Sequence, residues 1–262
     1  PSPAPPVPDW LIQHTLFTGE PRVLVLAAIA ALCIGLSKSG LSGTATLNVV
    51  LMAQAFGAKA SVGLVLPLLI AADLMGYYLN RHGGSWRQVL PMAPPAIAGV
   101  IAGWLLLDTI DNQAARTVIG WLIIGLLGFH LLLERRRQDL LALTEHRGFA
   151  QTLGFGAGVT TMLANAAGPV MTVYLLSRRL EKKDHLGVFS RFFLFINLFK
   201  VPFSANLGII HPQSLATNLV LLPVVVLGIL LGWQILKRIP QKAFERTLFL
   251  LTLVAALWLV LG

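Results

Sequence analysis

The chain has 262 residues, of which 56% are hydrophobic and 12% are charged, and its formal net charge is +9. Soluble globular domains carry about 25% charged residues, so this composition excludes an ordinary soluble protein and predicts an all-α polytopic membrane protein. The single cysteine, Cys33, excludes an internal disulfide and any relay built from two cysteines.

Residues 1–21 begin with the proline-rich stretch PSPAPPVP, which indicates an extended leader outside the cytoplasm. A short helix at the membrane surface is expected to follow, with Asp9 as its N-cap. A disordered terminus is the alternative interpretation of the same stretch.

Apolar segments then follow along the chain, at 22–36, 43–56, 60–80, 89–107, 116–133, 149–163, 168–177, 186–207, 215–236 and 244–261. GLSKSGLSGTATLN joins the first two, and LANAAG joins 149–163 to 168–177. At 1.5 Å per residue, an arm of about 15 residues covers about 22 Å, less than the roughly 30 Å of bilayer hydrocarbon. Both pairs are therefore predicted to form helical hairpins that turn inside the protein, and the other six segments to span.

Four loops are rich in lysine and arginine; they contain Arg81, Arg135, Arg178 and Lys237. If each hairpin returns to the side from which it enters, all four loops lie on one face of the membrane. The positive-inside rule makes that face cytoplasmic. The sequence thus predicts a multi-pass protein of the cell (inner) membrane with both termini outside the cytoplasm.

Two motifs recur along the chain. GVIAGWLLLDTI at 99–110 matches GILLGWQILKRI at 228–239 (228 − 99 = 129), and KASVG at 59–63 lies over KDHLG at 183–187 (183 − 59 = 124). An inverted-topology repeat explains both matches. Each half would be a broken-helix hairpin plus three transmembrane helices, in repeat 1 (22–134) and repeat 2 (148–262), joined by a cytoplasmic linker (135–147). Chance similarity between apolar helices is the alternative.

The hairpin tips predict an anion site. One new helix is expected to start after Ser42 or Thr44, and another after Asn165, with Pro169 in its first turn. Each tip then aims a helix N-terminus at the middle of the membrane, where free N–H groups and the helix dipole favour an anion. The candidate substrate-binding residues in the tips are Lys38, Ser39, Gly40, Ser42, Thr44, Asn165 and Gly168. As an alternative, Asn48 and Asn165 would only satisfy the broken backbone.

Further polar residues lie within the segment 186–207. Asn197 and Lys200 fall on one helical face, and both are candidate substrate ligands. Asp73 corresponds to Asn197 through the repeat (73 + 124 = 197) and would serve in proton coupling or as a charge partner of Lys38 or Lys200. The alternatives are lysines that extend to a membrane surface and an Asp73 with a purely structural role.

The segments GLSKSGLSGTATL, GAKASVG, GFGAGVTTMLANAAGPVMTVYLL and FINLFKVPF resemble the sulfite exporter TauE/SafE family of membrane permeases, over about Val23 to Gly262. The resemblance implies a substrate among sulfur-containing anions such as sulfite, sulfoacetate, sulfonates or thiosulfate. Charges and helix breaks alone indicate only a small anion. The thiosulfate branch of the family uses cysteines along its path, so the lone Cys33 favours sulfite or an organosulfonate.

The predicted function is therefore secondary transport, most simply export, by alternating access around a midplane anion site. A passive anion channel could use the same cations. An intramembrane enzyme would need a buried nucleophile and base or metal ligands. Ser37, Ser39 and Ser42 supply hydroxyl groups and Lys38 a possible base, but the sequence has no cluster of metal ligands, and this function is not favoured. We predict no catalytic residue, cofactor or metal site and no nucleic-acid partner. The expected partners are the sulfur anion and the lipid bilayer, and homo-oligomers are left open.

Overall fold

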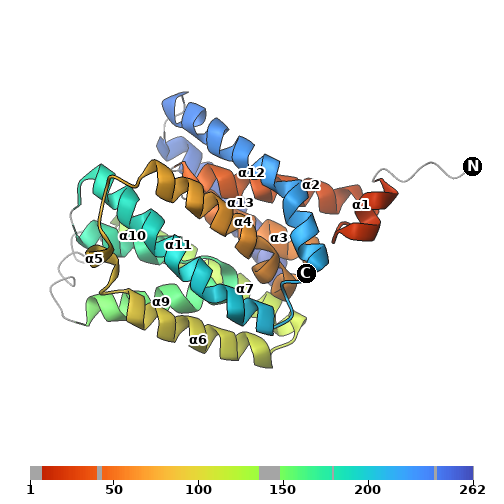
Figure 1. Cartoon of the computed structure of the whole chain (residues 1–262), viewed down its shortest axis with the longest axis horizontal. Helices are drawn as coiled ribbons and strands as arrows, with labels where there is room; N and C mark the ends of the chain where they lie inside the picture. The colour runs from red at the N-terminus through yellow and green to blue at the C-terminus, as the bar shows by residue number, and fades with distance from the viewer. Residues whose placement is uncertain (1–7, 40–42, 136–147, 179, 239–240, 262) are drawn as a thin grey trace, which may run out of the picture.

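The computed structural model describes residues 8–39, 43–135, 148–178, 180–238 and 241–261. In these ranges the regular structure is helical and contains no strand, which confirms the predicted all-α class. The helices of Figure 1 are α1 (Asp9–His14), α2 (Pro21–Lys38), α3 (Gly43–Phe56), α4 (Ala58–Leu79), α5 (Trp86–Val89), α6 (Ala93–Thr109), α7 (Asn112–Arg135), α9 (Phe149–Ala164), α10 (Gly168–Ser177), α11 (Lys182–Asn206), α12 (Pro212–Arg238) and α13 (Gln241–Leu261).

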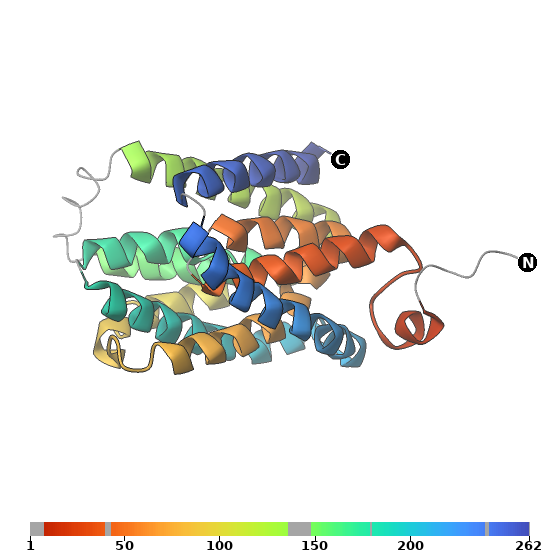
Figure 2. The ribbon, with the colours of Figure 1, turned by 90° about the horizontal axis from the view of Figure 1, so that it is seen from above.

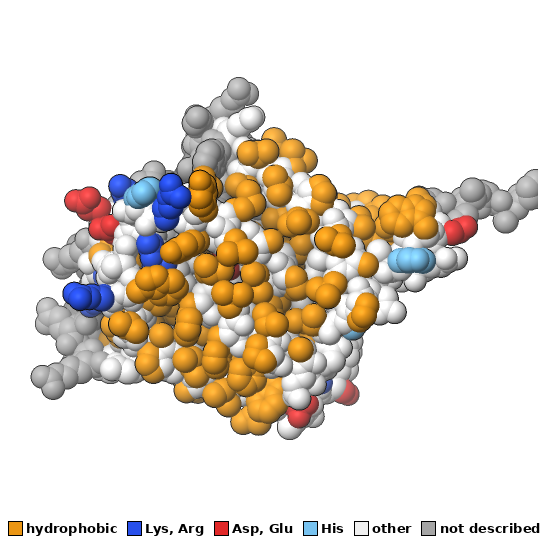
Figure 3. All heavy atoms as spheres, in the orientation of Figure 1, with side chains coloured by type: hydrophobic (Ala, Val, Ile, Leu, Met, Phe, Trp, Pro, Cys, Tyr) orange, Lys and Arg blue, Asp and Glu red, His pale blue; other side chains and the backbone are white. Residues whose placement is uncertain are grey.

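Within the described residues, five helices are long and apolar enough to cross a bilayer: Pro21–Lys38, Ala58–Leu79, Asn112–Leu132, Lys183–Asn206 and Pro212–Gly232. Large apolar side chains such as Trp121 and Leu219 are exposed. The face of the molecule drawn in Figure 3 is covered mainly by hydrophobic side chains. Such a surface is stable against lipid and not against water. The chain is a polytopic membrane protein.

Two helix starts differ from the prediction. The apolar segment 89–107 is divided, because residues 90–92 form a turn around Pro91 and the long helix α6 starts only at Ala93. Proline has no N–H to continue a helix, whereas the prolines in the first turn of α6 replace N–H groups that have no partner there. Asp9 is also not an N-cap. Pro8 holds that position, and Asp9 lies in the first turn of α1.

The two predicted hairpins are present, and they enter the molecule from opposite ends. α2 and α3 come from the end that carries α1, whereas α9 and α10 come from the other end, so that the two tips meet near the middle (Figures 1 and 2). The first arm is longer than expected, since α2 continues from Pro21 to Lys38. One apolar cluster joins α2, α4 and α12, and another joins α6, α9, α10 and α11. The tips lie between these two cores.

Glycines allow each first arm to cross a distant helix closely. A Cβ atom on Gly35 of α2 would lie 2.1 Å from the carbonyl oxygen of Val225 in α12. A Cβ atom on Gly158 of α9 would lie 2.1 Å from the carbonyl oxygen of Ala96 in α6. Only small residues permit such backbone contact between membrane helices. Each hairpin therefore packs its first arm onto a helix of the opposite half of the chain.

Positive charge gathers at one end of the molecule. Lysine and arginine side chains cluster where α4 ends, α11 begins and α5 lies (Figures 1 and 3). The connection between α6 and α7 lies at the opposite end with α1 and the last turn of α13 (Figures 1 and 2). It carries acidic residues, since Asp108 is in the last turn of α6 and Asp111 directly precedes α7. This separation of charge gives the molecule two chemically distinct ends.

Candidate functional site

The second hairpin turns at Asn165. α9 ends at Ala164, and Asn165 adopts the left-handed conformation (φ 53°, ψ 30°) and donates its N–H to the carbonyl of Thr161 (2.9 Å). Asn165 therefore closes α9 and is not the N-cap of α10, which is Ala167. The reason is that a helix C-terminus needs a residue that tolerates positive φ, and asparagine does so better than most. The predicted place of a proline in the first turn of α10 is confirmed.

Lys200 of α11 is fully buried and points at this turn. Its Nζ donates to the carbonyl of Thr161 (2.7 Å), to Asn165 Oδ1 (2.5 Å) and to Thr161 Oγ1 (3.2 Å). The orientation of the Asn165 amide is fixed by the bond from its Nδ2 to the carbonyl of Val62 (3.0 Å). Lys200 thus faces oxygen acceptors, which is the arrangement that suits a protonated ammonium.

Asp73 of α4 joins the first hairpin to α11. Lys38 Nζ lies 2.5 Å from Asp73 Oδ1, and Asn197 Nδ2 donates to Asp73 Oδ2 (2.7 Å). The offset of the predicted repeat makes Asp73 and Asn197 equivalent positions, and the two residues are in direct contact. Of the two lysines considered as partners of Asp73, Lys38 forms the ion pair. Asn197 Oδ1 lies 3.5 Å from the ammonium of Lys200, which continues the network to the second hairpin.

With both lysines protonated, the network carries one more positive charge than negative charge. Two ammonium groups, Lys38 and Lys200, flank a single carboxylate, Asp73, and Asp73 and Lys200 are at most 2% exposed. Such a net charge is expensive in the low dielectric of a membrane protein unless a counter-charge enters. A small anion between the hairpin tips would provide it.

Arg191 is a further buried cation of α11, but it does not belong to this network. Its guanidinium donates to the carbonyls of Gly83, Gly187 and Arg81 (2.6, 3.0 and 2.8 Å), and it lies over the ring of Tyr77. These contacts hold the loop after α4 at the positively charged end. The contacts of Arg191 are therefore structural, and they are separate from the network of Lys38, Asp73, Asn197 and Lys200.

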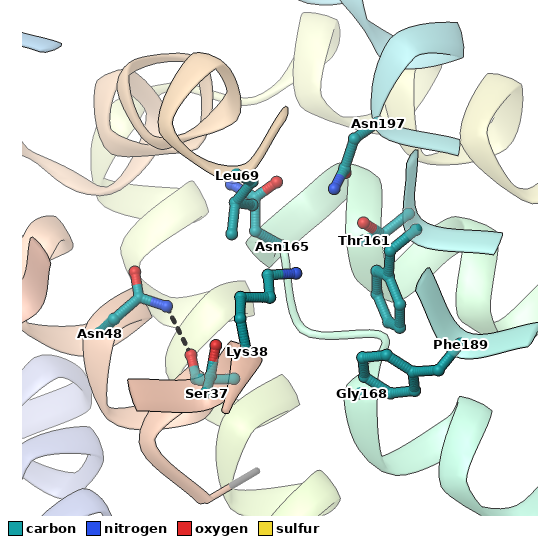
Figure 4. A pocket seen from close by; sticks show the side chains of 11 residues that line it. Ser37, Lys38, Asn48, Leu69, Thr161, Asn165, Gly168, Phe189 and Asn197 are labelled. Carbon is teal, nitrogen blue, oxygen red and sulfur yellow. Dashed lines mark hydrogen bonds between the residues drawn. The ribbon is translucent and has the colours of Figure 1, made fainter. Parts of the chain in front are cut away.

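A cavity lies between the two hairpin tips (Figure 4). It encloses about 490 Å³ of empty space, part of which is open to solvent. Its wall is formed by Ser37, Lys38, Ala45, Asn48, Leu69, Thr161, Asn165, Gly168, Phe189, Phe193 and Asn197. A narrow gap lined by Asn48 and Asn165 adjoins this cavity, but it has no room for a water molecule. Because Ala45 and Gly168 lie in the opening turns of α3 and α10, both helix N-termini reach the cavity.

Four of the predicted site residues come together on this wall: Lys38, Asn165, Gly168 and Asn197. Lys38 extends toward the side that carries Asn165, Thr161 and Phe189 (Figure 4). Lys200 and Asp73 lie directly behind the wall, each bonded to a residue that forms it.

The other predicted residues are placed differently. The side chain of Ser39 donates to the carbonyl of Leu36 (2.8 Å) and lies against Gly232 of α12, so it does not line the cavity. Thr44 is fully buried in the first turn of α3 and is absent from the wall as well. Gly40 and Ser42 lie outside the described residues.

Several wall residues were not predicted as ligands. Thr161 had a recognisable signal, since two adjacent threonines interrupt an otherwise apolar arm. Asn48 was interpreted as a backbone partner, and its Nδ2 does donate to the carbonyl of Ala45 (2.6 Å), but the residue also lines the cavity. Phe189 and Phe193 gave no signal, because aromatic residues on an apolar helix usually pack in a core.

Comparison with known proteins agrees with this architecture. The family Sulfite exporter TauE/SafE matches residues 26–259. A curated relative from Comamonas testosteroni, the "Probable inner membrane transporter protein TsaS", is 27% identical over 199 residues, which cover 74% of this chain and 80% of that protein. No solved structure matches. The family match covers nearly the whole chain, and it is supported by the helical membrane architecture. The chain belongs to the TauE/SafE sulfite exporter family of membrane transporters.

Proposed function

We propose that this protein is a secondary transporter that exports small sulfur-containing anions, either sulfite or an organosulfonate, by alternating access around the cavity between the hairpin tips. One observation carries the proposal. Lys38 and Lys200 together leave a net positive charge beside the cavity, because Asp73 is the only carboxylate in the described network. The opening turns of α3 and α10 add N–H groups that favour an anion. The family supplies the substrate class.

The packing of the two halves supports alternating access. The crossing of α2 over α12 at Gly35 has a counterpart in the crossing of α9 over α6 at Gly158, and α4 packs against α11. An inverted repeat of 22–134 and 148–262 would explain why the first arm of each hairpin packs on a helix of the other half. In that arrangement, Asp73 and Asn197 would be equivalent residues that meet between the halves. Transporters built on inverted repeats open by rocking one part against the other around a midplane site.

The membrane potential favours the outward direction. A negative cytoplasm repels an anion by about 2.3 kcal/mol per charge for each 100 mV. Export of sulfite or a sulfonate is therefore electrically downhill, whereas uptake would require coupling to another gradient.

Binding and exchange measurements test the function. Purified protein should bind sulfite or a singly charged organosulfonate more tightly than chloride, and liposomes that contain it should exchange labelled sulfite for unlabelled sulfite without a net current. A sustained current carried by chloride as well as by sulfite would identify a channel instead. Equal affinity for chloride and for every sulfur anion would contradict a sulfur-specific site.

The proposed orientation makes its own prediction. His82 and Gln113 are exposed at opposite ends of the molecule, and Cys33 is buried and should give little background labelling. In intact cells, an impermeant maleimide should label Gln113→Cys and should not label His82→Cys until the membrane is permeabilised. The reason is that the positive-inside rule places the loop with Arg81 in the cytoplasm. The reverse pattern of labelling would show that both termini lie inside.

A further inference from the structure

Asn48 presents a buried hydrogen-bond acceptor that has no partner among the described residues. The residue lies in α3, is 2% exposed and lines the cavity between the hairpin tips. Its Nδ2 donates to the carbonyl of Ala45 (2.6 Å), whereas its Oδ1 has no partner. Because a carbonyl only accepts, the amide nitrogen has to face Ala45, which leaves Oδ1 on the other side of the amide (Figure 4). A buried acceptor without a partner is costly, and a molecule that enters the cavity beside Asn48 can supply the missing donor.

The positive part of the site is separate from Asn48 Oδ1. Lys38 brings an ammonium group to the wall, Lys200 adds a second one behind the wall, and the opening turns of α3 and α10 present N–H groups. The Lys38 ammonium and the helix N–H groups can donate to the oxygens of an oxyanion, but these oxygens cannot satisfy Asn48 Oδ1, because both would be acceptors. The site therefore has a positive part and an acceptor part, and a bound molecule has to match both.

The net charge of the network limits the charge of the bound molecule. Two ammonium groups and one carboxylate leave a single positive charge, which a monoanion neutralises. A dianion would leave an excess negative charge away from water, and such a charge is costly.

We propose that the cavity selects singly charged sulfur oxyanions that keep a hydrogen-bond donor of their own, and that Asn48 Oδ1 accepts from this donor. The proposal rests on the function proposed above and narrows its substrate class. Hydrogensulfite and hydroxyalkanesulfonates belong to the selected class. Sulfate and thiosulfate, which are dianions without a donor, do not.

Two sulfonates of the same charge and the same number of non-hydrogen atoms provide the test. 2-Hydroxyethanesulfonate carries a hydroxyl group where propane-1-sulfonate carries a methyl group. The wild-type protein should bind the hydroxyl compound roughly 2- to 13-fold more tightly, which is the usual net effect of one neutral hydrogen bond. The variant Asn48→Leu keeps a similar shape without the acceptor, and it should lose this preference.

Ser37→Ala is the matched control. Ser37 also lines the cavity, and its hydroxyl donates to the carbonyl of Ile34 (2.7 Å) but could still accept a hydrogen bond. If Asn48 Oδ1 is the acceptor, the preference for the hydroxyl compound should persist in Ser37→Ala. Loss of the preference in Ser37→Ala and its retention in Asn48→Leu would overturn the assignment to Asn48.

The remaining outcomes separate this inference from the function on which it rests. Equal affinity of the wild-type protein for the two sulfonates would overturn the role of Asn48 and leave sulfonate transport intact. Sulfate binding as tight as that of 2-hydroxyethanesulfonate would overturn the selection by charge. If neither sulfonate nor sulfite binds, the proposed function itself fails.

Discussion

Lys200→Ala should abolish binding of sulfite and of sulfonates. The substitution removes the ammonium group that lies behind the cavity wall and brings the net charge of the network from +1 to zero. It also leaves the carbonyl of Thr161 and Asn165 Oδ1 without their donor. One charged hydrogen bond contributes about 1.5–3 kcal/mol, so the affinity should fall by at least roughly 10- to 150-fold in a calorimetric titration.

Two further variants make this result interpretable. Lys200→Arg keeps the charge, but a planar guanidinium cannot reproduce the compact contacts of the ammonium, so binding should be restored only in part. Lys183→Ala removes an exposed lysine near the start of α11 and should leave the affinity unchanged. Each variant is first checked for a single sharp peak in size-exclusion chromatography. Wild-type affinity in a folded Lys200→Ala protein would remove Lys200 from the site.

The pair Lys38 and Asp73 allows the net charge to be changed in both directions. Relative to the wild-type net charge of +1, Lys38→Met gives zero, Asp73→Asn gives +2, and the double variant returns to +1. The affinity for a monoanion should fall roughly 10- to 150-fold in Lys38→Met and should rise in Asp73→Asn. The double variant should regain most of the affinity, because it restores the charge balance.

The thermal stability of the Lys38 variant and of the double variant should change in the same direction as their affinity. Lys38→Met leaves the buried carboxylate of Asp73 without its cation, and breaking a buried pair in this way costs about 3–5 kcal/mol. The thermal midpoint should therefore drop in Lys38→Met and recover in the double variant. Unchanged affinity in a folded Lys38→Met protein would leave Lys38 as no more than a structural partner of Asp73.

Asp73→Asn also tests whether Asp73 carries a coupled proton. If it does, the variant should still bind the anion, while flux into liposomes no longer depends on pH. If flux keeps its wild-type dependence on pH, Asp73 serves only as the counter-charge of Lys38.

The sequence revealed the charged members of the site because polar residues are conspicuous in an apolar helix. Asp73 and Asn197 were related by the repeat alone, and they form a hydrogen bond (2.7 Å). Lys200 was noticeable because a lysine far from both ends of a membrane helix is energetically costly unless it has a partner or faces water. These predictions were possible because the free-energy cost of burying a polar group in a membrane does not depend on the particular fold.

The geometry of the tips could not be predicted in the same way. Asn165 suits an N-cap and a left-handed C-cap equally well, and the choice depends on where α9 ends. Ser39 points away from the cavity because it packs against Gly232, almost two hundred positions further along the chain. Contacts between residues so far apart in the chain cannot be predicted from the local sequence pattern. The place of the two phenylalanines on the cavity wall could not be predicted for the same reason.

The crossing of α2 and α12 has a consequence for how the protein is made. Gly35 and Gly228 are 193 residues apart (228 − 35 = 193), and their backbones touch in the finished molecule. At a synthesis rate of ~5–20 residues per second, the ribosome needs roughly 10 to 40 s to deliver the second helix after the first. During that interval α2 and α4 are in the bilayer with the charged residues Lys38 and Asp73, and α2 is not yet packed against α12. A nascent chain that stops before α12 is therefore expected to be a substrate for membrane quality control, however well its early helices insert.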